Sequence, residues 1–331
     1  MIPLETRRLR LRAVGEGDLG FVVRLHANAD LLRFIPSAVT PDASAARRLL
    51  ERFTELVCHP VQGFSLIELR QTGQAVGLIM VKPIPPADGT EPSVLEIGWR
   101  QVAEHCGHGY VTEAAAAVLE AVHDRGVKEL VAVTHPDNLA SQRVAERIGM
   151  ERIGTNRDYY DAAPQVLFRS CRRPAARHAW LPEGWELLPA GEYAFPGPLR
   201  DRLVGAILAG EKTATTALAA EYEAQHAPLP QVGSREVVVD SAGAPICVTE
   251  LTGIAVVPLG EVTDEHAVAE GEGWATAGQW RQAHERFWSS PQYLTWFDGL
   301  GAPAPVLDDD APVVCTRLRV LAAAPAAAGS A

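Results

Sequence analysis

The sequence has few cysteines and no long hydrophobic run. Five cysteines occur among 331 residues. Their number is odd, their positions are scattered and none has Cys-x-x-Cys spacing, which argues against a disulfide framework and a structural zinc site. No apolar stretch approaches the roughly 18 residues of a membrane span, and the N-terminus lacks the apolar segment of a signal peptide. We therefore expect a cytoplasmic protein that holds no metal ion and enters no membrane.

Basic residues are scarce in only one half of the chain. The formal net charge is −11, but residues 1–180 carry 22 basic and 21 acidic side chains, whereas residues 181–331 carry 8 and 20. A chain of this length corresponds to about two domains. The charge asymmetry therefore suggests two domains with different partners.

Hydrophobic periodicity in the N-terminal half predicts a mixed α/β sheet covered by helices. The spacing of apolar residues favours helices over residues 18–27, 42–57, 112–125 and 140–148. Strands are expected, in chain order, over residues 9–12, 64–69, 75–82, 94–101, 130–134 and 168–171. Strands come first and a β-α-β-α-β order follows, so we expect both antiparallel and parallel pairs.

Prolines and glycines mark a domain boundary, because between Arg172 and Pro198 they interrupt every regular pattern. We assign residues 1–175 to the first domain, 176–192 to a linker, 193–322 to the second domain and 323–331 to a flexible tail. Short strands with inserted helices predict a small β-barrel for the second domain. Its expected strands are residues 237–239, 245–251, 254–257 and 313–321, with a turn at Thr252-Gly253.

Two glycines precede the helix expected from residue 112. The segment Cys106-Gly107-His108-Gly109-Tyr110 joins the preceding strand to this helix. Glycines allow positive φ angles and close backbone approach, and the first turn of a helix offers unpaired N–H groups at the positive end of its dipole. This arrangement can bind a pyrophosphate, although an ordinary surface loop can have the same Gly-x-Gly spacing.

This loop belongs to a set of four sequence segments. They are Leu-Glu-Thr-Arg-Arg-Leu-Arg-Leu-Arg at 4–12, Gly-x-Gly-Tyr-x-x-Glu-Ala at 107–114, Asn-x-x-Ser at 138–141 and Ile-Gly-Met at 148–150. In this order they resemble the GNAT acyl-CoA N-acyltransferases, in the branch of the ribosomal-protein N-acetyltransferases, over roughly residues 2–170. The resemblance implies acetyl-CoA as co-substrate and an amine acceptor, either a protein N-terminus or a small amine. It assigns cofactor binding to Cys106, Gly107, His108, Gly109, Tyr110 and Asn138. Glu104 departs from the superfamily, which usually has Arg or Gln there.

The resemblance also implies roles near the reacting atoms. Asn138 would position the cofactor or the substrate, and Ser141 would donate to the leaving sulfur. Glu96, on the strand before the loop, could act as general base through a water, because an amine must lose a proton to attack a thioester. Structural explanations remain open, with Glu96 as a solvated carboxylate and Ser141 as a helix cap.

The acidic half contains a second motif, Gly210-x-Lys212-x-x-Thr215, after a helix expected over residues 199–209. A Glu-Gly-Glu-Gly stretch at 270–273 and a Trp-Arg-x-x-His stretch at 280–284 follow. In this order these segments resemble an ASCH domain, a small barrel related to the PUA-like RNA-binding fold, over about residues 193–321. One branch of that family hydrolyses N4-acetylcytidine. The resemblance to that branch implies that Lys212 activates the Thr215 hydroxyl and that the Glu270 carboxylate orients groups or carries protons.

Thr216 stands where many ASCH relatives have an arginine, and 20 acidic against 8 basic residues repel a phosphate backbone. Long RNA is therefore not expected, and a nucleoside-like ligand is. The tryptophans at 274, 280, 288 and 296 could stack on a base or anchor the core. Three interpretations of this half remain open. It is a module for a nucleoside-like ligand, an amidohydrolase of N4-acetylcytidine-type substrates, or a non-catalytic RNA- or nucleotide-binding regulatory module.

Overall fold

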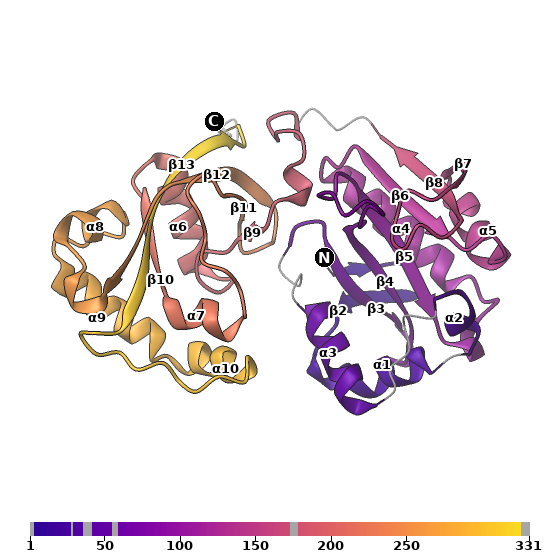
Figure 1. Ribbon diagram of the computed structural model, residues 1–331, viewed down its shortest axis with the longest axis horizontal. Helices are drawn as coiled ribbons and strands as arrows, with labels where there is room; N and C mark the ends of the chain where they lie inside the picture. Colours follow the sequence, from indigo (N-terminus) through magenta and orange to yellow (C-terminus); the bar gives the residue numbers. More distant parts are fainter. Residues whose placement is uncertain (1–2, 28, 36–41, 55–58, 173–177, 326–331) are drawn as a thin grey trace. The chain divides into compact units, whose positions relative to one another are not determined.

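The computed structural model describes residues 3–27, 29–35, 42–54, 59–172 and 178–325. The chain divides into two compact units, Met1–Ala190 and Gly191–Ala331, and each is described by itself (Figure 1). Within the described residues, no helix combines the length and the apolar character needed to cross a membrane. The six C-terminal residues of the expected tail and Cys58 lie outside the described residues.

The first unit is built on one eight-stranded sheet in the order β1-β2-β3-β4-β5-β6-β8-β7. Its strands are β1 (Leu4–Glu5), β2 (Leu9–Ala13), β3 (Gly63–Leu69), β4 (Ala75–Pro83), β5 (Leu95–Gln101), β6 (Glu129–Thr134), β7 (Glu151–Asn156) and β8 (Gln165–Cys171). β5 and β6 pair in parallel, and the other neighbours pair antiparallel. The predicted mixed sheet is confirmed.

Helices cover both faces of this sheet. They are α1 (Leu19–His26), α2 (Ala29–Phe34), α3 (Ala43–Thr54), α4 (Tyr110–Asp124) and α5 (Leu139–Arg147). Leu66 and Leu78 share a buried cluster with residues of α1 and α3. Their neighbours Ile67 and Ile79 are also fully buried but point to the opposite face, where α4 packs against β2 to β5. The sheet is therefore buried on both faces, with α1 and α3 on one face and α4 on the other.

The segment expected as a linker is ordered over its described part. Trp185, in a short 3-10 helix (Trp185–Leu187), is only 2% exposed. His59 Nε2 lies 2.8 Å from the Leu188 carbonyl oxygen, and Gln62 Nε2 donates to the Glu186 carbonyl oxygen at 2.6 Å. Residues 178–190 therefore pack on the first unit instead of spanning freely between the two units.

The second unit contains a five-stranded sheet in the order β10-β13-β12-β11-β9, in which β10, β13, β12 and β11 pair antiparallel. Its strands are β9 (Ala190–Gly191), β10 (Ala214–Leu218), β11 (Arg235–Val239), β12 (Pro245–Pro258) and β13 (Pro312–Ala323). The long strands β12 and β13 curve (Figure 1), so the sheet curls into a half-barrel, as the PUA-like prediction requires. The predicted turn at Thr252-Gly253 is wrong. A register shift between Leu251 and Gly253 accommodates these residues within one continuous strand.

Helices close the second unit. They are α6 (Pro198–Ala209), α7 (Ala219–Ala224), α8 (Asp264–Ala269), α9 (Ala277–Trp288) and α10 (Pro291–Gly299). α6 ends at Gly210 in the left-handed conformation. Trp280 and Trp288 on α9 are 0% and 2% exposed and belong to the core. These two tryptophans therefore anchor the core and are not free to stack on a base.

Candidate functional site

The loop between β5 and α4 exposes its glycine turn. Gly107 and Gly109 have φ angles of +81° and +74°, which strain any residue that carries a Cβ. No atom lies within 4 Å of the position that a Cβ would take at Gly107. Cys106, Gly107, His108 and Gly109 are all exposed. Gly109 is the N-cap of α4, and no described side chain caps this helix, so its first-turn N–H groups can receive an anion.

Side chains from the turn between β1 and β2 hold this loop. The Arg8 guanidinium donates to Glu113 Oε2 at 2.6 Å and to the His108 carbonyl oxygen at 3.0 Å, and it lies 4.8 Å from the centre of the Tyr110 ring. The His108 ring stacks on Tyr110 at 5.4 Å. Burial opposes ionisation of Glu113, but hydrogen bonds from Thr6 and Arg8 outweigh it and lower the pKa of Glu113. The charge of Arg8 is therefore largely neutralised, and backbone groups remain the main anion ligands of the loop.

The parallel strands β5 and β6 separate beside this loop. They pair only at Leu95 with Leu130 and at Glu96 with Val131, so the rest of each strand has no partner across this junction. The carboxyl ends of parallel strands lie at the same edge of a sheet. The glycine loop after β5 and residues 135–138 after β6 therefore flank one opening.

Asn138 and Ser141 follow β6, where they begin α5. Asn138 is the N-cap, and its Oδ1 accepts a hydrogen bond from the Ser141 backbone N–H at 3.1 Å. Asn138 therefore caps the helix, and Ser141 does not. The Ser141 side chain is half-buried, and its hydroxyl makes no hydrogen bond to the described residues. Two buried polar atoms near the same strand ends also lack a partner there, Thr134 Oγ1 and His105 Nε2.

Glu96 is buried in a small polar network on the sheet. Its side chain is 3% exposed, so the interpretation as a solvated carboxylate is wrong. Lys82 Nζ lies 2.6 Å from Glu96 Oε1, and the Tyr160 hydroxyl donates to the same oxygen. Burial is the largest cause of a raised pKa at Tyr160, and the charge of Glu96 is the next. The Tyr160 hydroxyl therefore stays protonated and can donate a hydrogen bond. Glu96 Oε2 has no partner among the described residues and remains able to accept a proton or a hydrogen bond.

In the second unit, Lys212 and Glu270 meet in the interior. Each side chain is 1% exposed, and Lys212 Nζ lies 3.3 Å from Glu270 Oε2 and 3.0 Å from Glu272 Oε1. Lys212 also donates to the Glu270 carbonyl oxygen at 3.2 Å. A Cβ at Gly271 would lie 2.5 Å from the Glu211 backbone. Only glycine at position 271 therefore allows the turn before β10 to pack so closely against the end of α8.

The Glu270 carboxylate is saturated with donors. Its Oε1 accepts from Thr216 Oγ1 at 2.7 Å and from Trp280 Nε1 at 2.9 Å, and it lies 3.2 Å from His266 Nε2. Its Oε2 contacts Lys212 and lies 3.4 Å from His284 Nε2. A carboxylate has about four lone-pair sites. Glu270 can therefore accept no further hydrogen bond without breaking one of these contacts.

The threonine that reaches this cluster is Thr216. Neighbouring residues of a strand point to opposite faces of the sheet, so Thr215 points away when Thr216 binds Glu270. No side-chain contact joins Thr215 to Lys212 or Glu270 in the described chain. The predicted trio is therefore corrected: Lys212 and Glu270 are brought together, and the hydroxyl beside them is that of Thr216.

Hydrogen bonds and neighbouring charges keep Glu270 and His266 ionised in the folded protein. Burial opposes ionisation of Glu270, but hydrogen bonds from His266 and His284 and the charge of Lys212 hold the pKa of Glu270 well below its ordinary value. Burial likewise opposes protonation of His266, but hydrogen bonds to Cys315 and Glu270 outweigh it and raise the pKa of His266 to about 9. An imidazolium and an ammonium thus neutralise two carboxylates.

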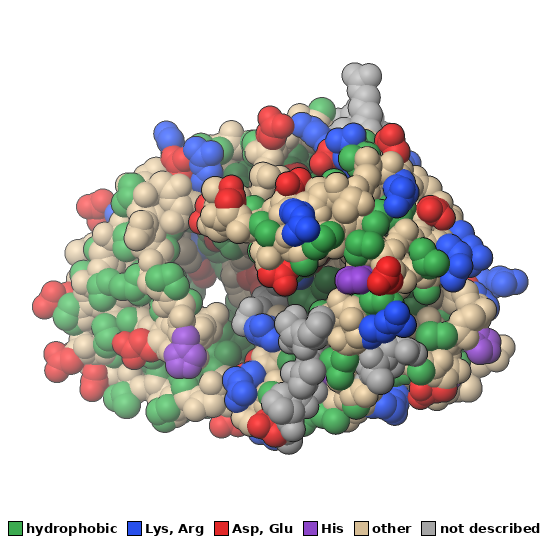
Figure 2. All heavy atoms as spheres, turned by 45° about the vertical axis from the view of Figure 1, so that its right-hand side comes forward, with side chains coloured by type: hydrophobic (Ala, Val, Ile, Leu, Met, Phe, Trp, Pro, Cys, Tyr) green, Lys and Arg blue, Asp and Glu red, His purple; other side chains and the backbone are tan. Residues whose placement is uncertain are grey.

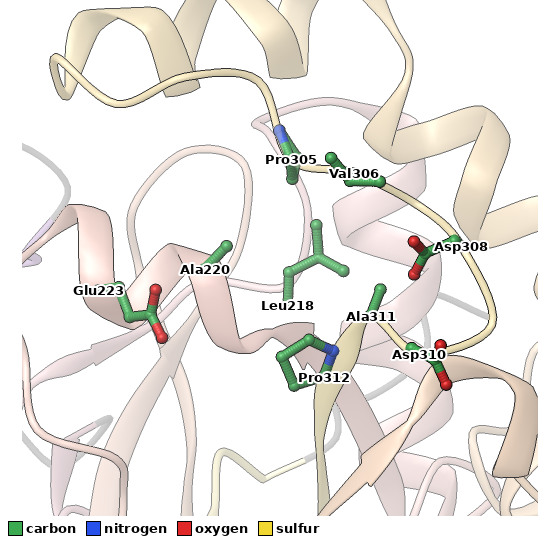
Figure 3. Close-up of a pocket in the computed structure, with 9 residues that line it drawn as sticks. All are labelled: Leu218, Ala220, Glu223, Pro305, Val306, Asp308, Asp310, Ala311 and Pro312. Carbon is green, nitrogen blue, oxygen red and sulfur yellow. The ribbon is translucent and has the colours of Figure 1, made fainter.

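A separate surface cavity of about 310 Å³ lies between the start of α7 and the segment before β13. Figure 3 shows Leu218 at its centre, with Pro305 and Val306 on one side and Pro312 on the other. Its polar side chains are the carboxylates Glu223, Asp308 and Asp310. No residue of the Lys212–Glu270 cluster lines it. An apolar floor with acidic edges suits a ligand that has an apolar face and hydrogen-bond donors.

Two family models match this chain, one for each unit. The model described as an acetyltransferase (GNAT) domain matches residues 8–151, and the model described as an ASCH domain matches residues 192–322. A relative from Bacillus subtilis, the uncharacterized N-acetyltransferase YnaD, is 38% identical over 152 residues, which cover 46% of this chain and 84% of the relative. The chain belongs to the GNAT acetyltransferases. It carries an ASCH domain as its second unit, and both predicted families are confirmed.

Two further similarities cover one unit each. The uncharacterized protein YkkB of Bacillus subtilis is 36% identical over 95 residues, which cover 28% of this chain and only about half (54%) of that relative. The crystal structure of an ASCH domain from Lactobacillus crispatus is 27% identical, covers 41% of this chain and 80% of that chain, and has a TM-score of 0.36.

GNAT acetyltransferases use acetyl-CoA, and the residues at the end of β5 fit this co-substrate. The exposed glycine turn and the uncapped first turn of α4 offer backbone donors for a pyrophosphate. The unpaired polar atoms of His105 and Thr134 lie in the segments that flank the same opening. Within the described residues, no group of three or more His, Cys, Asp and Glu side chains could hold a metal ion.

The candidate site in the first unit includes residues that the sequence analysis did not single out. Lys82 and Tyr160 contact Glu96, and Arg8 orders the glycine loop. Arg8 lies within a segment that the GNAT resemblance included, so its position carried a signal. Lys82 pairs with Glu96 across the hairpin of β4 and β5, which strand register predicts once both strands are known. Tyr160 lies in the loop between β7 and β8, and no local pattern marks it.

Proposed function

We propose that the first unit transfers the acetyl group of acetyl-CoA to an amine, at the opening between the ends of β5 and β6. The observation that carries this proposal is the position of Glu96 on the strand that leads into the exposed glycine loop. This buried carboxylate has one oxygen without a partner among the described residues. Bound acetyl-CoA supplies an activated acyl carbon and a thiolate leaving group. The loop supplies anion ligands, and the strand supplies a proton acceptor.

Glu96 is suited to receive the proton of the acceptor amine, directly or through a water. Lys82 and Tyr160 hold Oε1, which fixes the carboxylate in one orientation and leaves Oε2 as the accepting atom. An ammonium that donates to Oε2 is positioned and can lose its proton there. Positioned general bases typically contribute about 10²–10⁴-fold to a rate.

Ser141 and Asn138 have more modest roles in this proposal. The Ser141 hydroxyl is unengaged within the described chain and remains a possible donor to the leaving sulfur. Asn138 acts by fixing the first turn of α5, which presents Ser141 to the opening. Asn138 is therefore a positioning residue, and its own amide N–H₂ group is left to contact the substrate or the cofactor.

Glu96→Gln tests this assignment. The variant keeps the shape of the side chain but removes the proton acceptor, so kcat for acetylation of a small amine or a peptide N-terminus should fall by about 10²-fold or more. The dissociation constant of acetyl-CoA, measured by calorimetry, should change little. Glu120→Gln is the matched control, because Glu120 is exposed on α4. Wild-type protein that folds but does not bind acetyl-CoA contradicts the whole proposal, and full activity of Glu96→Gln contradicts only the role of Glu96.

For the second unit we propose a binding function for a nucleoside-like ligand, on the basis of the cavity around Leu218. Its apolar lining can receive the face of a base, and its carboxylates can accept hydrogen bonds from amino and hydroxyl groups. Three carboxylates repel a phosphate, in agreement with the 8 basic and 20 acidic residues of 181–331. Figure 2 shows one face of the chain, on which acidic and basic side chains of the described residues are interspersed.

Titration of the full chain with cytidine, N4-acetylcytidine and cytidine monophosphate tests this binding function. We expect the nucleosides to bind more tightly than the monophosphate, and Asp310→Asn to weaken them. Asp298→Asn, an exposed change on α10 outside the cavity, is the control. Release of cytidine from N4-acetylcytidine would instead support the amidohydrolase interpretation. The absence of binding by every nucleoside contradicts the proposed binding function.

A further inference from the structure

Arg100 is a half-buried cation that forms no ion pair with the described residues. It lies on β5 with a partly exposed side chain, and its Nη1 contacts His26 Nε2. Within the described residues, its guanidinium makes no other hydrogen bond and no ion pair. A guanidinium has five N–H donors. Most of the hydrogen-bonding capacity of Arg100 is therefore unused.

The one partner of Arg100 is uncharged. His26 Nδ1 lies 2.8 Å from the Val22 carbonyl oxygen, so this nitrogen carries the proton and Nε2 accepts from Arg100. Burial, followed by the charge of Arg100, lowers the pKa of His26 to about 4, and the imidazole is neutral at physiological pH. His26 thus orients the guanidinium but does not neutralise it. Desolvating a cation without pairing it costs free energy, and a bound ligand can supply the pairing group that the described residues do not.

Arg100 and Glu96 lie on the same face of β5. They are four residues apart, and alternate residues of a strand share a face. The register confirms the arrangement, because Glu96 pairs with Lys82 and Arg100 pairs with Leu78 on β4. Lys82 forms an ion pair with Glu96. Burial lowers the pKa of Arg100, the charge of Glu96 partly opposes this shift, and the charge of Arg52 on α3 adds to it. The face that presents Glu96 to an acceptor amine is therefore cationic at Arg100, although the chain as a whole is acidic.

We infer that Arg100 binds a carboxylate of the acceptor, so that the preferred substrate is an amine that also carries an anionic group. The inference rests on the proposed acetyl transfer at Glu96 and names the class of its acceptor. The planar guanidinium matches a carboxylate with two parallel hydrogen bonds. Four residues of strand span about 13 Å between the two Cα atoms. The separation suits a carboxylate several bonds from the amine, as in the second residue of an acidic peptide.

Matched acceptor pairs test the inference with the full chain. One pair consists of amidated peptides that begin Ala-Glu or Ala-Gln, and the other of 6-aminohexanoate and its amide. The acid member of at least one pair should have a kcat/KM about 10- to 100-fold higher, the range expected for one charge-assisted interaction. The pair that shows the preference distinguishes a peptide from a free amino acid. The absence of any preference in both pairs overturns the inference.

Variants assign the preference to Arg100. Arg100→Gln should raise KM for the acid member and leave the neutral member unchanged, and Arg100→Lys should restore part of the preference. Arg152→Gln, an exposed change on β7, is the control and should alter neither. An equal loss for both members in Arg100→Gln, with an unchanged melting temperature, indicates a structural role and contradicts the inference.

Calorimetry separates this inference from the proposed function. The same pairs are titrated into wild-type and Arg100→Gln protein in the presence of CoA. If the wild type binds the acid member selectively, the variant does not, and no amine is acetylated, then the proposed acetyl transfer fails and the anion site holds. If amines are acetylated but binding does not depend on the carboxylate, the anion site fails and the proposed function holds.

Discussion

The two units of this protein treat buried charge in opposite ways. In the ASCH unit, Lys212 and Glu270 are each 1% exposed, and the contacts of the cluster occupy the whole of the Glu270 carboxylate. Among the described residues of the GNAT unit, Glu96 has one oxygen without a partner, and Arg100 forms its single hydrogen bond with a neutral histidine. The difference separates charges that stabilise a fold from charges that remain available to a ligand.

The physical basis is the cost of desolvation. A buried ion pair contributes stability only when all of its donors and acceptors are satisfied. Once all of them are satisfied, no donor or acceptor of the pair remains to bind a substrate. A half-satisfied carboxylate or guanidinium costs stability in the free protein, and a ligand that completes it recovers that cost. The Lys212–Glu270 motif, which resembles a hydrolase site, thus has its hydrogen-bonding groups occupied, whereas the face of β5 that carries Glu96 and Arg100 has groups available to a ligand.

The largest change in stability is expected from Glu270→Gln in the ASCH unit. The amide cannot neutralise Lys212 and His266, and its own N–H₂ group meets other donors. Removing one member of a buried ion pair typically costs about 3–5 kcal/mol, so the unfolding transition of the ASCH unit should shift strongly in urea. Tryptophan fluorescence reports this transition, because Trp280 and Trp288 lie in the same core. Acetyl-CoA binding reports the state of the GNAT unit and should be unaffected.

Glu265→Gln is the matched control on the same helix. Glu265 is 86% exposed and pairs with Arg317 at 3.0 Å, and exposed pairs of this kind contribute about 0–1 kcal/mol. If Glu270→Gln destabilises no more than Glu265→Gln, the cluster is not the structural centre of the ASCH unit. Retained stability together with loss of nucleoside binding would assign Glu270 to a ligand site instead.

The next largest expected effect is the pH dependence of the stability that this cluster contributes. The pKa of His266 is raised in the folded state, to about 9, from an ordinary value of about 6.5. Its stabilising contribution is fully present below pH 6.5 or so and is lost as the pH rises through about 9. The melting temperature of the ASCH unit should therefore fall between these values. His266→Gln should have a lower melting temperature at pH 6.5 and a smaller slope above it, and an unchanged slope would contradict this origin.

The sequence predicted the parts of the fold that depend on local chemistry. The apolar stripes of α4 and α5, the C-terminal Gly210 of α6 and the positive-φ glycines of the loop after β5 all follow from residue type and spacing. Strand β10 did not follow, because its Ala-Thr-Thr-Ala-Leu sequence has little hydrophobic contrast. Its pairing with β13, about 100 residues later in the chain, determines its conformation.

In the candidate sites, too, the contacts between distant segments could not be predicted from the sequence. Glu96 was found from the motif, but its partner Tyr160 comes from a loop more than 60 residues away. The choice of Thr216 over Thr215 depends on which face of β10 meets α8, and a shift of one residue reverses it. The unpaired state of Arg100 is visible only when its neighbours from α1 are in place. Contacts between distant segments, and their absence, are not encoded in any single stretch of sequence.

The smallest expected effect distinguishes backbone strain from ligand binding in the GNAT loop. Gly107 and Gly73 have φ angles of +81° and +69°, and neither has an atom within 4 Å of an added Cβ. Gly107→Ala and Gly73→Ala should therefore cost similar stability, about 1–2 kcal/mol each. Only Gly107→Ala should weaken acetyl-CoA, because relief of the strain turns the N–H groups of the loop away from the pyrophosphate. Calorimetry with acetyl-CoA measures the difference, and equal affinity of the two variants would remove the glycine turn from the binding site.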